Sequence, residues 1–360
     1  MCPAPPRRAL GRRRVALAAV VALLCCLIGP SPMATAAGTV TAQAVPTVSS
    51  RLFPLTVGGS TLKLEYYGNG DVLVPDPIIK TVVLVIHGDS RNAADYARYS
   101  VESSQSAGVA SSTLVVAPHF IADSDSAARI ASRLYWSEGG WKQGDKSQSD
   151  TYLRPWRMSS FAVLDAFVAK VAAFPNMTRI VVAGHSAGGQ FVNRYAAGTQ
   201  STVKRTYVVA NPSSYLYFSA KRWRNGVLRS LTSSEARSCP GFDHFKYGLR
   251  EPNAAMVAVG AATLGARYSS ARVTYLLGAE DTDPNSASLD TSCAAKWQGS
   301  ARYQRGSQFH AYLGTVFGQA VYERHKLVRV PGVAHDGHEM LMSPGGRSAL
   351  FGTAAAAPAR

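Results

Sequence analysis

The stretch from Arg179 to Gly189, which reads Arg-Ile-Val-Val-Ala-Gly-His-Ser-Ala-Gly-Gly, decides the fold. Its first half is rich in β-branched residues and predicts a short buried strand, and the residues after it can continue as a helix. Gly184, Ser186 and Gly188 form the pattern Gly-x-Ser-x-Gly. Small residues two positions before and after the serine allow a strand and a helix to come very close. We therefore predict a strand, a tight turn with Ser186 at its apex, and a helix.

A serine at such a turn can act as a nucleophile. Its hydroxyl is a poor nucleophile until a base takes its proton, so the fold must lift the oxygen clear of the sheet and hold a histidine beside it. A tight strand-to-helix turn, the nucleophile elbow, does this. The alternative is a glycine-rich loop with an incidental serine, but the strand before Gly184 and the helix after Gly188 favour the elbow.

Short strands alternate with helical patterns from about residue 81, which is typical of parallel βαβ units. We predict strands at 81–86, 113–117, 180–183, 205–210, 273–277 and 326–330, and helices at 93–107, 159–174 and 302–318. The segment from Arg51 to Tyr67 instead predicts an antiparallel pair of strands with its turn at Gly58 and Gly59.

Length and composition favour one large α/β domain. At 360 residues, with 46% hydrophobic and 17% charged side chains, the chain can bury a large core. We place this domain at 51–351, after a flexible segment at 38–50 and before a disordered tail at 352–360. Two long stretches, 119–157 and 211–272, interrupt the alternation of strands and helices. We interpret 211–272 as a cap-like insertion over the active site.

Aromatic residues are concentrated in these two stretches. Either they line a groove for an apolar or aromatic substrate, or they pack the interior of the cap, and the sequence favours neither interpretation. The residues concerned are Tyr135, Trp136, Trp141, Trp156, Tyr215, Tyr217 and Phe218.

Residues 1–37 have the order of a secretory signal peptide. Five arginines are followed by the apolar run from Val15 to Ile28 and then by small residues around Ala34 to Ala36. A membrane anchor is the alternative, but fourteen apolar residues are too few to span a bilayer of ~30 Å as a helix. We therefore expect a secreted protein, in an extracellular or periplasmic-type compartment, with no stable membrane span.

The charge is strongly basic, at +16 for the whole chain. Loss of residues 1–37 removes five arginines and no acidic residue, which leaves 33 basic and 22 acidic side chains and a charge of +11. Such a charge could attract acidic polymers. No block of basic residues interleaved with aromatics argues for nucleic acid, and Arg222-Trp223-Arg224, the nearest match, is explained as well by a solvated loop. We expect no nucleic-acid partner.

Cysteine spacing predicts one disulfide and no metal site. Cys2, Cys25 and Cys26 leave with the signal peptide, so the exported protein keeps Cys239 and Cys293, which we expect to pair in an oxidising compartment. No cluster of cysteine and histidine has zinc spacing. No glycine-rich loop has the pattern that holds a phosphate. We therefore expect neither a metal nor a cofactor.

With these motifs the chain resembles the α/β-hydrolase family over residues 51–351. In that family the catalytic residues follow in the order serine, acid, histidine, with the acid after a late strand. The resemblance implies Asp281 as the acid, three residues past the glycine that ends the strand at 273–277, with Asp283 and Glu280 as alternates. A calcium loop does not explain these acids, because they lack EF-hand spacing.

The family's histidine follows the last strand. The resemblance implies His335 here, in Pro331-Gly332-Val333-Ala334-His335, with His338 as an alternate that fits better in the first turn of the following helix. His335 would take the proton of Ser186 and return it to the leaving group, while Asp281 fixes its tautomer and stabilises the imidazolium.

The family also stabilises the oxyanion of the tetrahedral intermediate with two backbone amides. The resemblance implies Ala187 as one donor and a residue of the loop His87-Gly88-Asp89-Ser90 as the other. Since Asp89 and Ser90 replace further glycines of the family's motif, either of them is a candidate for the second donor. The family pattern implies a structural role for His87.

These features imply a secreted serine hydrolase that cleaves a carboxylic ester, either a small molecule or a polymer. One alternative is an exported acyltransferase of the same fold, which would have an acceptor groove that excludes water. A peptidase has less support, because no pocket for a peptide is recognisable. A catalytically silent binding protein of this fold is disfavoured, because such proteins usually lack one of the three catalytic residues.

Overall fold

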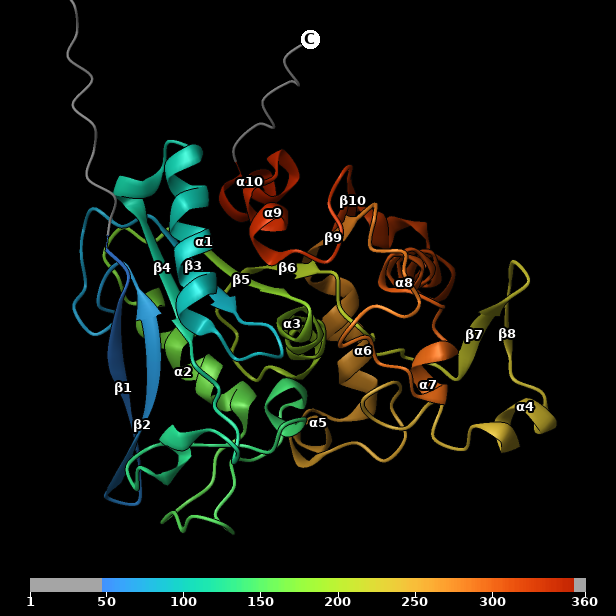
Figure 1. Cartoon of the computed structure of the whole chain (residues 1–360), viewed down its shortest axis with the longest axis horizontal. Helices are drawn as coiled ribbons and strands as arrows, with labels where there is room; N and C mark the ends of the chain where they lie inside the picture. The colour runs from blue at the N-terminus through green and yellow to red at the C-terminus, as the bar shows by residue number, and fades with distance from the viewer. Residues whose placement is uncertain (1–46, 353–360) are drawn as a thin grey trace, which may run out of the picture. The chain divides into compact units, whose positions relative to one another are not determined.

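The computed structural model describes residues 47–352 and has an eight-stranded sheet at its centre (Figure 1). The five neighbouring pairs from β4 through β10 are parallel, and the β1–β2 and β2–β4 pairs are antiparallel. In spatial order the strands are β1 (Ser49–Val57), β2 (Ser60–Gly68), β4 (Thr113–Pro118), β3 (Thr81–Ile86), β5 (Arg179–His185), β6 (Thr206–Ala210), β9 (Arg272–Gly278) and β10 (His325–Val330). The predicted mostly parallel sheet is therefore confirmed.

The antiparallel pair at the start of the sheet is also confirmed. Gly58 and Gly59 form its turn with φ of 56° and 83°, values in the left-handed region that glycine adopts without strain. Strand β1 begins earlier than we predicted. Ser49 and Ser50, assigned to a flexible segment, pair with Gly68 and Tyr67, because the antiparallel register continues to the end of β2.

Helices cover both faces of the sheet (Figure 1). One face packs against α1 (Ala93–Ser106), α9 (Gly337–Met342) and α10 (Pro344–Phe351), and the other packs against α2 (Ser160–Ala172), α3 (Ala187–Gly198), α6 (Ala261–Ser270) and α8 (Arg302–Phe317). Alternate residues of β3 face these two layers: Val83 and Val85 lie in the first core, and Leu84 and Ile86 in the second. Because both faces are buried, the strand is apolar from Val82 to Ile86.

The insertion at 211–272 contains short elements and one helix that packs on the sheet domain. It contains β7 (Lys221–Arg224), β8 (Val227–Ser230), α4 (Ser233–Ser238), α5 (Ala254–Val259) and α6. Helix α6 packs against α3 and so belongs to the helix layer of the sheet. The predicted disulfide between Cys239 and Cys293 is present and joins the insertion to α7 (Cys293–Lys296).

Short helices complete the described residues. They are the 3₁₀ helices η1 (Ala110–Ser112), η2 (Ser126–Arg129), η3 (Gly140–Gln143) and η4 (Gln319–Glu323). Between residues 47 and 352, no helix combines the length and the hydropathy needed to cross a bilayer. The predicted signal peptide at 1–37 lies outside the described residues, as do 38–46 and nearly all of the predicted tail at 352–360.

Candidate active site

The turn between β5 and α3 has the geometry of an elbow. Ser186 has φ 58° and ψ −118°, a conformation that residues other than glycine rarely adopt, and its amide donates a 3.0 Å hydrogen bond to Ala210 O. A Cβ on Gly184 would lie 2.3 Å from Gly188 O, and one on Gly188 would lie 2.1 Å from Ile86 O. Close backbone approach therefore requires both glycines, as the sequence pattern predicts.

Two hydrogen bonds join the three residues named from the family pattern. His335 Nε2 lies 3.0 Å from Ser186 Oγ, and His335 Nδ1 lies 2.7 Å from Asp281 Oδ2. The residues follow β5, β9 and β10, whose carboxyl ends lie at the same edge of the parallel sheet. With Nδ1–H donating to Asp281, Nε2 is free to accept the proton of Ser186.

The alternates of the sequence analysis lie elsewhere. Glu280 and Asp283 are exposed, and Asp283 Oδ1 accepts a hydrogen bond from Asn285 N. His338 is in the first turn of α9 and contacts Glu102 Oε2 at 2.8 Å. Of the acids and histidines considered, only Asp281 and His335 are joined to each other and to the serine.

Comparisons with known proteins bear on the fold. No protein-family model matches the chain, and no curated protein matches it. Among solved structures, poly(aspartic acid) hydrolase-1 from Sphingomonas sp. KT-1 has a TM-score of 0.56 and 24% identity, over 85% of this chain and 99% of that one. The poly(3-hydroxybutyrate) depolymerase LpqC from Bordetella parapertussis has a TM-score of 0.55 and 23% identity, over 86% and 92%.

The chain has the α/β-hydrolase fold. In this fold the loop after β3 lies beside the elbow, and here it begins with the buried His87. His87 Nδ1 donates to Gly88 O, and Nε2 accepts from Phe120 N at 3.1 Å. Burial lowers the pKa of His87 to about 3. Neutral and fully bonded, this side chain holds the loop after β3 in place.

His185, directly before the serine, is a second buried neutral ring. Its Nδ1 lies 2.9 Å from Tyr96 Oη, and its ring centroid lies 4.7 Å from that of His335. Burial, with a further contribution from the charge of His335, lowers the pKa of His185 well below its usual value. A neutral neighbour would not repel a positive charge on His335.

Sequence reasoning missed two residues that hold the acid and the histidine. Arg302, fully buried at the start of α8, lies 3.4 Å from Asp281 Oδ1, on the oxygen that His335 does not contact. Its guanidinium also donates to Ser286 Oγ and Ala287 O. It therefore compensates the charge of Asp281 and fixes the loop that follows it. Nothing in the local sequence distinguishes this arginine from one on a helix surface.

Asn211 is the second. Located directly after β6 with φ 41°, it accepts a hydrogen bond from Gly278 N at 2.9 Å and donates one to Ala334 O at 3.1 Å. It thereby ties the end of β9 to the residue before His335. An asparagine followed by proline at the end of a buried strand is a signal that could have pointed to it.

The candidate oxyanion donors lie around the serine. Ala187 begins α3, so its amide has no acceptor within the helix. Asp89 and Ser90 both line a cavity of about 350 Å³ that contains Ser186 and His335. Of these two residues, only Asp89 also lines a second cavity, of about 210 Å³, which contains Ser186 and Ala187. Asp89 thus lines both cavities that contain the serine, which favours it as the second donor.

Both cavities are lined mainly by polar residues, and neither is an aromatic groove. Five of the seven aromatic residues considered, among them Trp136, Trp141 and Tyr215, are fully buried in the core, and none of the seven lines either cavity. For these five residues the packing interpretation is confirmed, because their rings lie in buried clusters of the interior. A larger cavity of about 540 Å³, lined in part by Trp223 and Trp297, contains none of the three joined residues.

Proposed function

We propose that the protein is a secreted serine hydrolase that cleaves carboxylic esters. Ser186 is the nucleophile, His335 the general base and then the general acid, and Asp281 the partner of His335. One observation carries the proposal: a serine with φ 58° ends a chain of two hydrogen bonds, 3.0 Å and 2.7 Å long, to a histidine and a buried aspartate.

The reaction follows from these positions. Ser186 Oγ attacks the ester carbonyl while His335 Nε2 takes its proton, and Asp281 stabilises the imidazolium. The negative oxygen of the tetrahedral intermediate accepts hydrogen bonds from the amides of Ala187 and of Asp89 or Ser90. The intermediate then expels the alcohol, which receives the proton from His335, and leaves an acyl-enzyme. Water, deprotonated by His335, attacks the acyl-enzyme and releases the acid.

Two observations support water as the acceptor of the acyl group. Two similar solved proteins are named as hydrolytic enzymes, a poly(aspartic acid) hydrolase and a poly(3-hydroxybutyrate) depolymerase. The cavity that contains His335 is bounded by polar groups, among them Asn92 and Asp336, and such surroundings admit water. An acyltransferase of the same fold is distinguished by its products. Added glycerol would give acyl-glycerol with a transferase and free acid with a hydrolase.

Secretion is part of the proposal. The disulfide between Cys239 and Cys293 fits an oxidising compartment, and the order of residues 1–37 fits a cleaved signal. Expression with these residues should deliver active protein outside the cytoplasm, with an amino terminus near residue 38. Full-length protein retained in the cytoplasm would contradict this part.

The test of the enzyme is hydrolysis of 4-nitrophenyl acetate, butyrate and palmitate, together with labelling by a fluorophosphonate. Ser186→Ala should lose both the turnover and the label, since it removes the only atom proposed to form the acyl-enzyme. Ser270→Ala, which removes an exposed hydroxyl on α6, is the matched control and should retain both. A folded wild type with neither turnover nor label would refute the proposal and favour a binding protein.

A further inference from the structure

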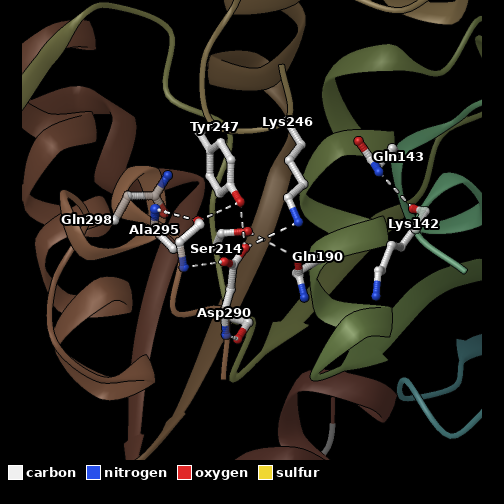
Figure 2. A network of polar contacts seen from close by, with 12 residues as sticks. Lys142, Gln143, Gln190, Ser214, Lys246, Tyr247, Asp290, Ala295 and Gln298 are labelled. Atoms are coloured by element: carbon white, nitrogen blue, oxygen red, sulfur yellow. Dashed lines mark hydrogen bonds and ion pairs between the residues drawn. The ribbon is translucent and has the colours of Figure 1, made fainter. Parts of the chain in front are cut away.

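The cavity of about 210 Å³ beside Ser186 is unusually rich in charged groups. Lys142, in η3, and Lys246, in the insertion, reach it from segments far apart in the sequence (Figure 2). Lys142 forms an ion pair with Asp89, and Lys246 Nζ lies 3.2 Å from Asp290 Oδ2. Both lysine side chains are mostly buried, so a ligand that binds them competes with little water.

The two lysines have hydrogen-bond donors to spare. Each ammonium has three N–H groups, and among residues 47–352 each contacts one carboxylate. Asp290 is already well supplied, since Oδ2 accepts from Tyr247 Oη at 2.7 Å and Oδ1 accepts from Ser292 N. Burial raises the pKa of Asp290, but Lys246 and these hydrogen bonds outweigh it and hold the pKa at about 2. The unused lysine donors are therefore available to a ligand.

Gln190, on α3, adds a further donor. Its Oε1 accepts hydrogen bonds from Arg194 Nη2 at 3.3 Å and from Ser214 Oγ at 3.0 Å, an assignment that leaves the amide nitrogen for the cavity (Figure 2). The polar groups that line the cavity beside the serine thus offer an excess of donors. A ligand that satisfies them must be rich in acceptors.

Arg194 lies behind this cavity and adds a third positive charge. It is fully buried, and within the described part of the chain it forms no ion pair with a carboxylate. Burial lowers its pKa to about 10, so it stays protonated at neutral pH. Its guanidinium donates to the carbonyls of Lys142 and Lys246 and so holds both lysine-bearing segments. With Asp89 and Asp290, the charges around the cavity total +1.

The proposed mechanism places this cavity on the acyl side of the scissile bond. His335, which returns its proton to the leaving alcohol, lines the other cavity and not this one. This cavity instead contains Ser186 together with Ala187, the candidate oxyanion donor. Its volume of about 210 Å³ accommodates a short acyl chain.

We propose that the cavity binds a carboxylate at the far end of the acyl chain, so that the preferred substrates are half-esters of short dicarboxylic acids. Lys246, Lys142 and Gln190 donate to this carboxylate and thereby select the substrate. The proposal rests on the proposed function for its catalytic consequence, whereas the binding of the carboxylate itself does not require turnover.

The test compares mono-4-nitrophenyl glutarate with 4-nitrophenyl pentanoate, which has the same chain length and no second carboxylate. Rates are corrected with Ser186→Ala, because the glutarate ester also hydrolyses slowly by itself. The wild type should have the higher kcat/KM for the glutarate. Lys246→Met should lower the glutarate-to-pentanoate ratio on the order of ten- to a hundredfold, the value of a hydrogen bond to a charged group. Lys326→Met, on the exposed side of β10, removes the same charge and should leave the ratio unchanged.

Calorimetric titration with glutarate is the second measurement. Glutarate should bind the wild type and Lys326→Met alike, and Lys246→Met at least tenfold more weakly. Hydrolysis of the pentanoate without any preference for the glutarate, or a ratio unaffected by Lys246→Met, would overturn the carboxylate site and leave the proposed function intact. Glutarate binding that depends on Lys246, in a protein without turnover, would support the site and refute the proposed function. Absence of both binding and turnover would refute both.

Discussion

Lowering the pH from 8 to 5 should reduce the free energy of unfolding by at least about 4 kcal/mol, because the fold buries His87 and His325 as neutral rings. His325 is as completely enclosed as His87. Its Nε2 donates to Tyr268 O and its Nδ1 accepts from Tyr275 Oη, each at 2.9 Å. Burial lowers the pKa of His325 to about 4 and that of His87 to about 3.

The sign and the magnitude follow from these two values. In the unfolded chain a histidine has a pKa near 6.5. Between that pH and the pKa of the folded state, the unfolded state binds more protons, so the free energy of unfolding decreases as the pH is lowered. At pH 5 the difference is nearly one proton for each ring. Integrated from pH 8, each ring contributes about 2 kcal/mol, and the pair about 4 kcal/mol, out of the ~5–15 kcal/mol typical of a domain. His185, whose pKa is lowered in the same direction, adds to this.

Urea unfolding at pH 8 and pH 5, followed by tryptophan fluorescence with the disulfide intact, measures this difference. Carboxylates contribute little in this interval, since their pKa values lie below it. His325→Gln should be less stable at pH 8, yet its loss of stability between pH 8 and pH 5 should be smaller by about 2 kcal/mol. A wild-type difference below about 1 kcal/mol, or an unchanged difference in His325→Gln, would refute the reasoning.

Three further variants test the scaffold of the site. Gly188→Ala should lower kcat/KM at least a hundredfold, because its Cβ would lie 2.1 Å from Ile86 O and displace the elbow. Asn211→Ala should destabilise the fold by about 1–3 kcal/mol and reduce activity, since it leaves the buried amide of Gly278 and the part-buried carbonyl of Ala334 without partners. Arg302→Met should cost about 3 kcal/mol of stability, because Asp281 then keeps a buried charge without its cation. Ester hydrolysis and urea unfolding measure all three.

Matched controls separate these effects from the mere loss of a side chain or a glycine. Gly241→Ala adds a Cβ where nothing lies within 4 Å and should keep full activity. Arg98→Met removes an arginine from an exposed ion pair with Asp95 and should change stability by less than about 0.5 kcal/mol. If Gly188→Ala were as active as Gly241→Ala, or Arg302→Met as stable as Arg98→Met, the corresponding explanation would be wrong.

Much of the fold could be predicted because its signals are local. The strands β3, β5 and β10 lie within two residues of their predicted bounds, since apolar runs between turn residues mark them. The spacing of Gly184 and Gly188 predicted the elbow. At both positions, two residues before and after the serine, another backbone segment comes so close that only glycine fits. The roles of the three joined residues stay predictions until the serine variant is assayed.

Other features could not be predicted because they depend on distant segments. The aromatic residues of 119–157 and 211–272 suggested a groove as readily as a core, and only packing shows that most of them are buried. Arg302 resembles any arginine at the start of a helix until β9 places Asp281 beside it. Burial of a side chain is a property of the whole tertiary structure, so no local pattern records it.

The sequence by itself determined the order of strands and helices and the elbow at Ser186, and its family resemblance implied Asp281 and His335 after late strands. These follow from periodicity, from steric limits on the backbone and from motif order, all of which act over a few residues. Only the tertiary structure brought Lys142, Lys246 and Gln190 together around one cavity, and set the neutral state of His87 and His325. Charge and solvation depend on distance through space, which the spacing along the chain does not contain.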